Sequence, residues 1–160
     1  MQRRGVLMVA AMLASVWLLG ACGSGMVRRV SDPAASLQQL TVNTDGSWSL
    51  QLRLQNYSSI AMRFDSVTLA MKIGGQKAGT VQATPQLSIG PESADVVTVA
   101  FAPTSEARVA VADALVSRRG IAYSLEGSIA AVPEEAKTRT FTLTSRNTLS
   151  PVPGLDGVLR

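Results

Sequence analysis

The chain has 160 residues, with 15 basic and 11 acidic side chains, one cysteine and no histidine. The lack of histidine removes the commonest general base and the commonest soft metal ligand, and a single cysteine cannot form an intrachain disulfide. Most hydrolase sites are therefore excluded, and the small net charge and dispersed basic residues do not indicate nucleic-acid binding.

An apolar run opens the chain. Residues 5–20 are almost wholly apolar, follow Arg3 and Arg4, and end shortly before the only cysteine, Cys22. A positive start, a short apolar run and small residues at the break are typical of a secretory signal, and the run is too short to favour a membrane span. We predict a cleaved signal peptide over residues 1–21.

The residues at the break, Leu19-Gly20-Ala21-Cys22, resemble the lipobox of bacterial lipoprotein precursors, with Gly20 where alanine or serine is commoner. The resemblance implies that Cys22 is lipidated and anchors the mature chain to the cell envelope. Gly23 in place of aspartate implies the outer membrane, facing the periplasm. The alternatives are an ordinary secreted protein with a free thiol and a retained anchor.

Residues 22–35 are predicted to be the lipidated N-terminus and a flexible tether, because Gly, Ser, Arg and Asp dominate this segment. Arg28 and Arg29 within it either contact anionic headgroups or are simply solvated. Removal of the signal peptide leaves 139 of the 160 residues, enough for one domain. We place that domain at 36–146, followed by a C-terminal tail over 147–160 that is loose or lies along the surface.

Alternation of apolar and polar residues predicts six or seven β-strands. Residues 48–55 are the most regular strand, and the slip in phase between Phe64 and Val67 indicates a bulge. Asp45-Gly46 and Gly74-Gly75 favour hairpin turns. The predicted segments are 36–42 (an edge strand), 48–55, 62–73, 77–87 (interrupted by Gly79 and Pro85), 96–101, 121–127 and 138–144.

One helix is predicted after the strand at 96–101, capped by Thr104 or Ser105. Arg118 and Arg119 suit its C-terminal end, and Gly120 is the residue expected just beyond it. Its apolar stripe is predicted to be Val109, Ala112, Leu115 and Val116.

Many short strands with a single late helix indicate an all-β, antiparallel sandwich. The aromatic side chains beyond the signal peptide fall in phase with the apolar faces of the strands, except Tyr57. A place in the core is favoured for them over a ligand-stacking role. These core aromatics are Trp48, Phe64, Phe101, Tyr123 and Phe141.

Four stretches in this order resemble the WHy (water stress and hypersensitive response) domain, which is shared with the group-2 late embryogenesis abundant proteins and occurs in bacterial lipoproteins. The resemblance implies an immunoglobulin-like or fibronectin-like sandwich of about seven strands with one short helix. The stretches are 50–57 (LQLRLQNY), 69–79 (LAMKIGGQKAG), 87–99 (LSIGPESADVVTV) and 114–127 (ALVSRRGIAYSLEG).

The Asn-Pro-Asn motif of the WHy domain corresponds here to Gln55-Asn56-Tyr57, so the proline is missing. Asn56 at a strand end is able to bond neighbouring backbone amides and to accept unusual φ angles. A structural cap is favoured for Asn56 over contact with a ligand.

No catalytic or metal-binding pattern is found in the sequence. Glu134-Glu135 is the only adjacent pair of acidic residues, and it lies in a polar loop. The aspartates lack the spacing of a calcium loop, and no Ser-x-x-Lys motif offers a lysine base to a serine. We expect no enzyme, no metal and no cofactor.

Two functions remain open. The first is a non-enzymatic envelope lipoprotein that protects against desiccation, osmotic stress or cold, as the WHy resemblance implies. The second is a periplasmic binding or assembly module that holds a protein, lipid or envelope-polymer partner. In both, the membrane is contacted through lipidated Cys22.

Overall fold

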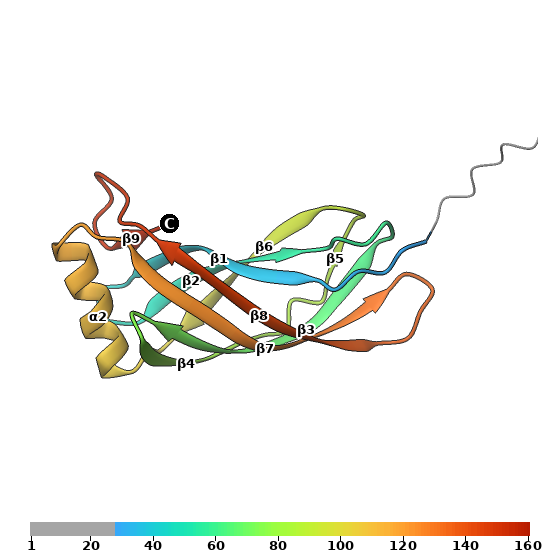
Figure 1. The fold of residues 1–160 in the computed structure, drawn as a ribbon, viewed down its shortest axis with the longest axis horizontal. Coiled ribbons are helices and arrows are strands. Elements are labelled where there is room, and N and C mark those ends of the chain that lie inside the picture. Colours follow the sequence, from blue (N-terminus) through green and yellow to red (C-terminus); the bar gives the residue numbers. More distant parts are fainter. Residues whose placement is uncertain (1–27) are drawn as a thin grey trace, which may run out of the picture.

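The computed structural model describes residues 28–160, which form two antiparallel sheets and one helix (Figure 1). The first sheet has the strand order β6-β2-β1-β9, and the second has the order β4-β3-β7-β8, with β5 also paired to β3. The predicted all-β antiparallel class with one helix is confirmed, with nine strands in place of about seven. The elements are β1 (Ala34–Val42), β2 (Trp48–Gln55), β3 (Met62–Ile73), β4 (Gln76–Ala83), β5 (Leu87–Ile89), β6 (Ala94–Phe101), α2 (Ser105–Val116), β7 (Ile121–Pro133), β8 (Arg139–Leu149) and β9 (Val158–Leu159). The predicted signal peptide and Cys22 lie outside the described residues.

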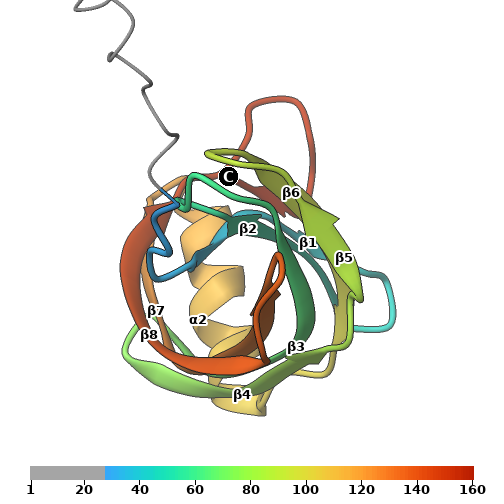
Figure 2. The same ribbon diagram turned by 90° about the vertical axis from the view of Figure 1, so that its right-hand side faces the viewer.

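The two sheets wrap around a single core, and α2 lies across one end of it (Figure 2). Alternate residues of the regular strands point inward, so β2 buries Trp48, Leu50, Leu52 and Leu54 while the residues between them face outward. The predicted core aromatics are all buried, and Tyr57 is 47% exposed, as its phase indicates. Trp48 and Phe101 face each other across β2 and β6 with ring centroids 5.9 Å apart.

The predicted turns and the bulge are confirmed. A hairpin joins β1 to β2 through Gly46 at φ 81°, and a second joins β3 to β4 through Gly74 and Gly75, both at positive φ. The register of β3 against β7 shifts between Phe64 and Ser66. The segment predicted as one interrupted strand over 77–87 is instead two strands, β4 and β5, which both pair with β3. Pro85 lacks an N–H for a ladder hydrogen bond, so strand pairing is interrupted around this residue.

The structure extends the domain beyond the predicted 36–146 at both ends. β8 runs to Leu149, and β9 pairs with β1 through Leu159 opposite Leu40. Leu159 is fully buried, so the last strand of the C-terminal segment packs into the core, while residues 153–156 are exposed and lie along the surface. A two-residue strand is too short to show alternation, which is why the sequence did not reveal it. With β9 beside it, β1 is also not a bare edge strand.

The predicted tether over 22–35 is shorter than expected, because its described part is bound to the domain. The backbone N–H of Arg29 donates to Ser59 Oγ at 2.8 Å, and that of Ser31 donates to Ser58 Oγ at 3.0 Å. The backbone of Ala34 already belongs to β1. Composition alone did not reveal these contacts, because their partners lie about thirty residues away in the sequence.

The helix has the predicted N-cap, but of the predicted apolar stripe only Leu115 packs against the core. Thr104 is the N-cap, and its hydroxyl accepts from the N–H of Ala107. Its buried residues are Ala107, Val111 and Ala114, whereas Val109 and Val116 are 69% and 85% exposed. Small apolar residues occur all round this helix, so periodicity could not select the face that contacts the sheets.

The structure makes a direct prediction for this face. Val111→Ala should lower the free energy of unfolding by about 2 kcal/mol, because it leaves a cavity under the helix. Val109→Ala should change it by about 0.5 kcal/mol or less, because that side chain faces solvent. Urea unfolding curves of the two variants measure the difference, and equal effects would contradict the assigned face.

The helix ends without the predicted glycine. Ser117 is the C-cap and Arg118 takes the left-handed conformation at φ 51°, two residues before Gly120. The N–H groups of Arg118 and Arg119 then donate to the carbonyls of Leu115 and Ala114. Within residues 28–160, no helix combines the length and the apolar character that crossing a bilayer requires.

Candidate functional site

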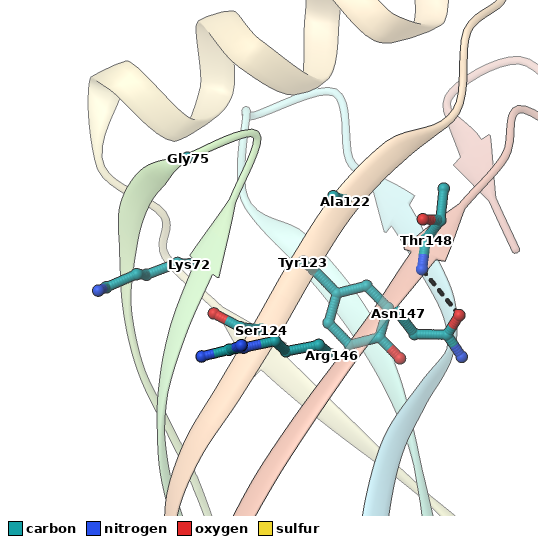
Figure 3. A pocket seen from close by; sticks show the side chains of 8 residues that line it. All are labelled: Lys72, Gly75, Ala122, Tyr123, Ser124, Arg146, Asn147 and Thr148. Atoms are coloured by element: carbon teal, nitrogen blue, oxygen red, sulfur yellow. Dashed lines mark hydrogen bonds between the residues drawn. The ribbon is translucent and has the colours of Figure 1, made fainter.

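A shallow depression of about 460 Å³ lies on the outer face of the second sheet (Figure 3). One row across the depression consists of Lys72, Ser124 and Arg146. Lys72 on β3 lies opposite Ser124 on β7, and Ser124 lies opposite Arg146 on β8. Their neighbours Met71, Ile73 and Leu125 point into the core, so strand alternation turns the row outward.

The row carries two cations, Lys72 and Arg146, and neither forms an ion pair within residues 28–160. The ion pairs found in the described part of the chain involve other arginines, at positions 28, 29, 63 and 119. Adjacent strands are about 4.8 Å apart, so the backbones that carry Lys72 and Arg146 are about 10 Å apart, and both long side chains are able to reach the space above Ser124. Two cations and a hydroxyl suit an oxyanion such as phosphate, whereas they supply no base or nucleophile pair.

Asn56 lies far from this depression, at the opposite end of β3. Its side chain is fully buried, and its Nδ2 donates to the carbonyl oxygens of Ile60, Ile89 and Gly90 at 2.8, 3.1 and 2.9 Å. Its Oδ1 accepts from the N–H of Ser58 at 2.9 Å. Asn56 thus fastens the turn after β2 to the end of β5, which is a structural task and leaves no polar atom for a ligand.

The acidic residues of the described part of the chain do not form a metal-binding cluster. Glu135 pairs with Arg28 at the surface, and within residues 28–160 no group of three or more acidic, cysteine or histidine side chains could hold a metal ion. Cys22 lies outside the described residues.

Comparison with known proteins identifies the family. The LEA_2 family, described as late embryogenesis abundant protein, matches residues 51–147, which is more than half of the chain. The chain belongs to this family. The matched segment runs from β2 into β8 and contains both Asn56 and the Lys72–Arg146 row, while β1 and β9 lie outside it. The resemblance to late embryogenesis abundant proteins is therefore confirmed at the level of the family.

The fold of this chain is similar to that of a solved structure. The solution structure of a protein from Arabidopsis thaliana has a TM-score of 0.52 at 11% identity, covering 86% of this chain and 93% of that one. The solution structure of a putative late embryogenesis abundant protein has a TM-score of 0.48 at 12% identity, covering 94% and 88%. No curated protein matches the chain.

The row across the depression gives a testable expectation for the LEA_2 domain. Inorganic phosphate should bind there, and Lys72→Ala or Arg146→Ala should each weaken binding about tenfold, because each removes one charge-assisted contact. Chemical-shift titration at low ionic strength measures this affinity. Arg53→Ala, an exposed change on the outer face of β2, should leave it unaltered. Equal losses in all three variants would indicate diffuse charge attraction and no site.

Tyr123 has a role in the LEA_2 domain that its apolar phase did not reveal. Its hydroxyl oxygen accepts from the N–H of Leu37 at 2.9 Å, at the bulge in β1, and so ties the second sheet to the first. Burial raises the pKa of Tyr123 above its ordinary value of 10.0, although the hydrogen bond from Leu37 opposes this shift. The only sign in the sequence is a tyrosine where the core would accept phenylalanine.

This raised pKa makes stability depend on pH. The unfolded chain loses the Tyr123 proton near pH 10 while the folded chain keeps it, so the free energy of unfolding should fall as the pH rises above about 10. Tyr123→Phe should remove that part of the slope. It should also cost about 1–3 kcal/mol at pH 7, because the N–H of Leu37 loses its partner. Urea unfolding from pH 7 to 11 tests both effects, and an unchanged slope would contradict the first.

Proposed function

We propose that this chain is a bacterial envelope lipoprotein whose LEA_2 domain, of the WHy type, protects the cell against desiccation, osmotic stress or cold. The observation that carries the proposal is the LEA_2 match over residues 51–147 in a chain that begins with an apolar run ending at Leu-Gly-Ala-Cys22. In this proposal Cys22 is the lipidated N-terminus, and the domain faces the periplasm without catalysing a reaction.

The outer face of the second sheet supports a protective role through weak surface contacts. β8 presents Thr140, Thr142 and Thr144 outward, and in the register Thr142 is followed by Ser128 on β7 and Thr68 on β3. Hydroxyls of this kind exchange hydrogen bonds between water and other polar surfaces. Such a face would keep neighbouring proteins or membrane surfaces apart when water is withdrawn.

Gene deletion followed by drying or salt shock tests this role. Survival should fall in the deletion strain and return with the wild-type gene. Complementation with the Cys22→Ala variant should fail, because that variant keeps the domain and lacks the lipid. Unchanged survival of the deletion strain would contradict the protective role, and full rescue by Cys22→Ala would contradict the need for an anchor.

The depression favours a second candidate function, an accessory module that holds an anionic envelope ligand or a partner carrying one. Lys72 and Arg146 flank Ser124 without an ion-paired carboxylate, which leaves their charges free for a ligand. Affinity purification from detergent-solubilised membranes separates the two functions. A module should retain one stoichiometric partner that Lys72→Ala releases, whereas a protectant should give a diffuse background that this change does not alter.

A further inference from the structure

The chain enters the domain at one end of the molecule (Figure 1). Arg28, the first described residue, is only six residues after Cys22. Six residues span at most about 20 Å when fully extended. A lipid on Cys22 would therefore hold this entry point close to the bilayer surface.

The entry point is fixed to the domain on several sides. The N–H of Ser59 donates back to the carbonyl of Arg29 at 3.0 Å, so these two residues are joined in both directions. The guanidinium of Arg29 donates to the carbonyl of Tyr57 at 3.1 Å and pairs with Glu92 at 3.3 Å. Arg28 pairs with Glu135 in the loop between β7 and β8. The chain emerges among three loops, 56–61, 90–93 and 134–138, which together with residues 28–31 we call the entry end.

The surface of the entry end suits a bilayer interface. Tyr57 is 47% exposed there and is the one exposed aromatic side chain in the described part of the chain. Tyrosine prefers the headgroup level of a membrane, where its ring is apolar and its hydroxyl remains wet. The charges of Arg28 and Arg29 are balanced by Glu135 and Glu92, so little net charge has to be desolvated or matched by lipid.

The helix lies at the other end of the molecule (Figure 1). β7 has 13 residues and runs between the two ends, so it separates them by about 40 Å. Exposed Val116 on α2 lies at this far end. A domain held upright by its entry end keeps α2 well outside the reach of the lipid.

We infer that the entry end docks on the membrane, with Tyr57 at the level of the headgroups and α2 pointing away. This inference rests on the proposed function, because it needs the lipid on Cys22. It fixes which surface of the LEA_2 domain faces the periplasm: the depression with Lys72 and Arg146, near the α2 end of β3, is then free for soluble ligands.

Fluorescence quenching by brominated lipids tests the orientation. The lipidated full chain is reconstituted into vesicles of phosphatidylethanolamine and phosphatidylglycerol as wild type, Tyr57→Trp and Val116→Trp. Native Trp48 is buried and serves as the common background. The emission of the tryptophan at 57 should fall about twofold, while that at 116 should stay unchanged, because only an indole near the headgroups meets bromine. Both sites are exposed, so neither change should disturb the fold.

The mass of the mature N-terminus is measured on the same samples. A lipidated chain that is quenched at 57 and not at 116 supports the inference. A lipidated chain with no quenching at 57, or with equal quenching at both positions, overturns the inference and leaves the proposed function standing. A chain with an unmodified Cys22 overturns both.

Discussion

Replacing Asn56 by alanine is expected to lower the free energy of unfolding by about 3 kcal/mol. The change removes the donor for the carbonyls of Ile60, Ile89 and Gly90 and the acceptor for the N–H of Ser58, all at a site with no solvent access. Buried polar groups that lose their partners keep the full cost of having left water. Chemical denaturation followed by tryptophan fluorescence of Trp48 measures this loss.

Asn43→Ala is the matched control. Asn43 lies in the hairpin between β1 and β2, where its exposed Nδ2 donates to Ser47 Oγ at 2.9 Å. Water can replace that bond, so the same substitution should cost about 0.5 kcal/mol. Similar losses at positions 43 and 56 would show that Asn56 acts only through local turn preference and does not fasten two loops together.

Gly127→Ala is expected to cost about 3 kcal/mol or more of the free energy of unfolding, more than an added methyl group at any other glycine within residues 28–160. A Cβ at Gly127 would lie 2.1 Å from the carbonyl oxygen of Thr68 and 3.0 Å from the Cα of Leu69. Both atoms belong to the backbone of β3, so no side chain can rotate away to make room. The pairing of β3 with β7, the centre of the second sheet, would have to open.

Gly154→Ala provides the comparison for this second prediction. Gly154 has φ 79° and no atom within 4 Å of the added Cβ, so its cost comes from backbone conformation alone. About 1 kcal/mol is expected. Thermal and urea unfolding of both variants separates crowding from conformation. A Gly127→Ala protein as stable as Gly154→Ala would contradict the close approach of β3 and β7.

The middle of the fold could be predicted from the sequence. The bounds of β2 and β3 match the predicted 48–55 and 62–73, because half-buried strands with one wet face impose strict alternation. The ends could not be predicted in this way. β9 is too short to show a period, and residues 28–31 are held by partners far away in the sequence.

The candidate site depends on features that a single segment does not contain. Lys72, Ser124 and Arg146 are ordinary outward residues of three separate strands, and only the register of β3, β7 and β8 places them in one row. Asn56 was predicted as a structural residue from its place at a strand end, but its three carbonyl partners follow from the position of β5, which the sequence did not resolve. The sequence therefore indicates the type and orientation of each of these residues, but not which residues lie beside it in the folded protein.

The pairing of β1 with β9 joins the first and last strands of residues 28–160. Contacts of such long sequence separation require a large loop to close before they contribute energy, and proteins rich in them fold slowly, over milliseconds to seconds. The first sheet therefore reaches its full width only after residue 159 is available. Until β9 is in place, the backbone of β1 at Leu40 and Thr41 is an open sheet edge, and such an edge is able to pair with a strand of another molecule.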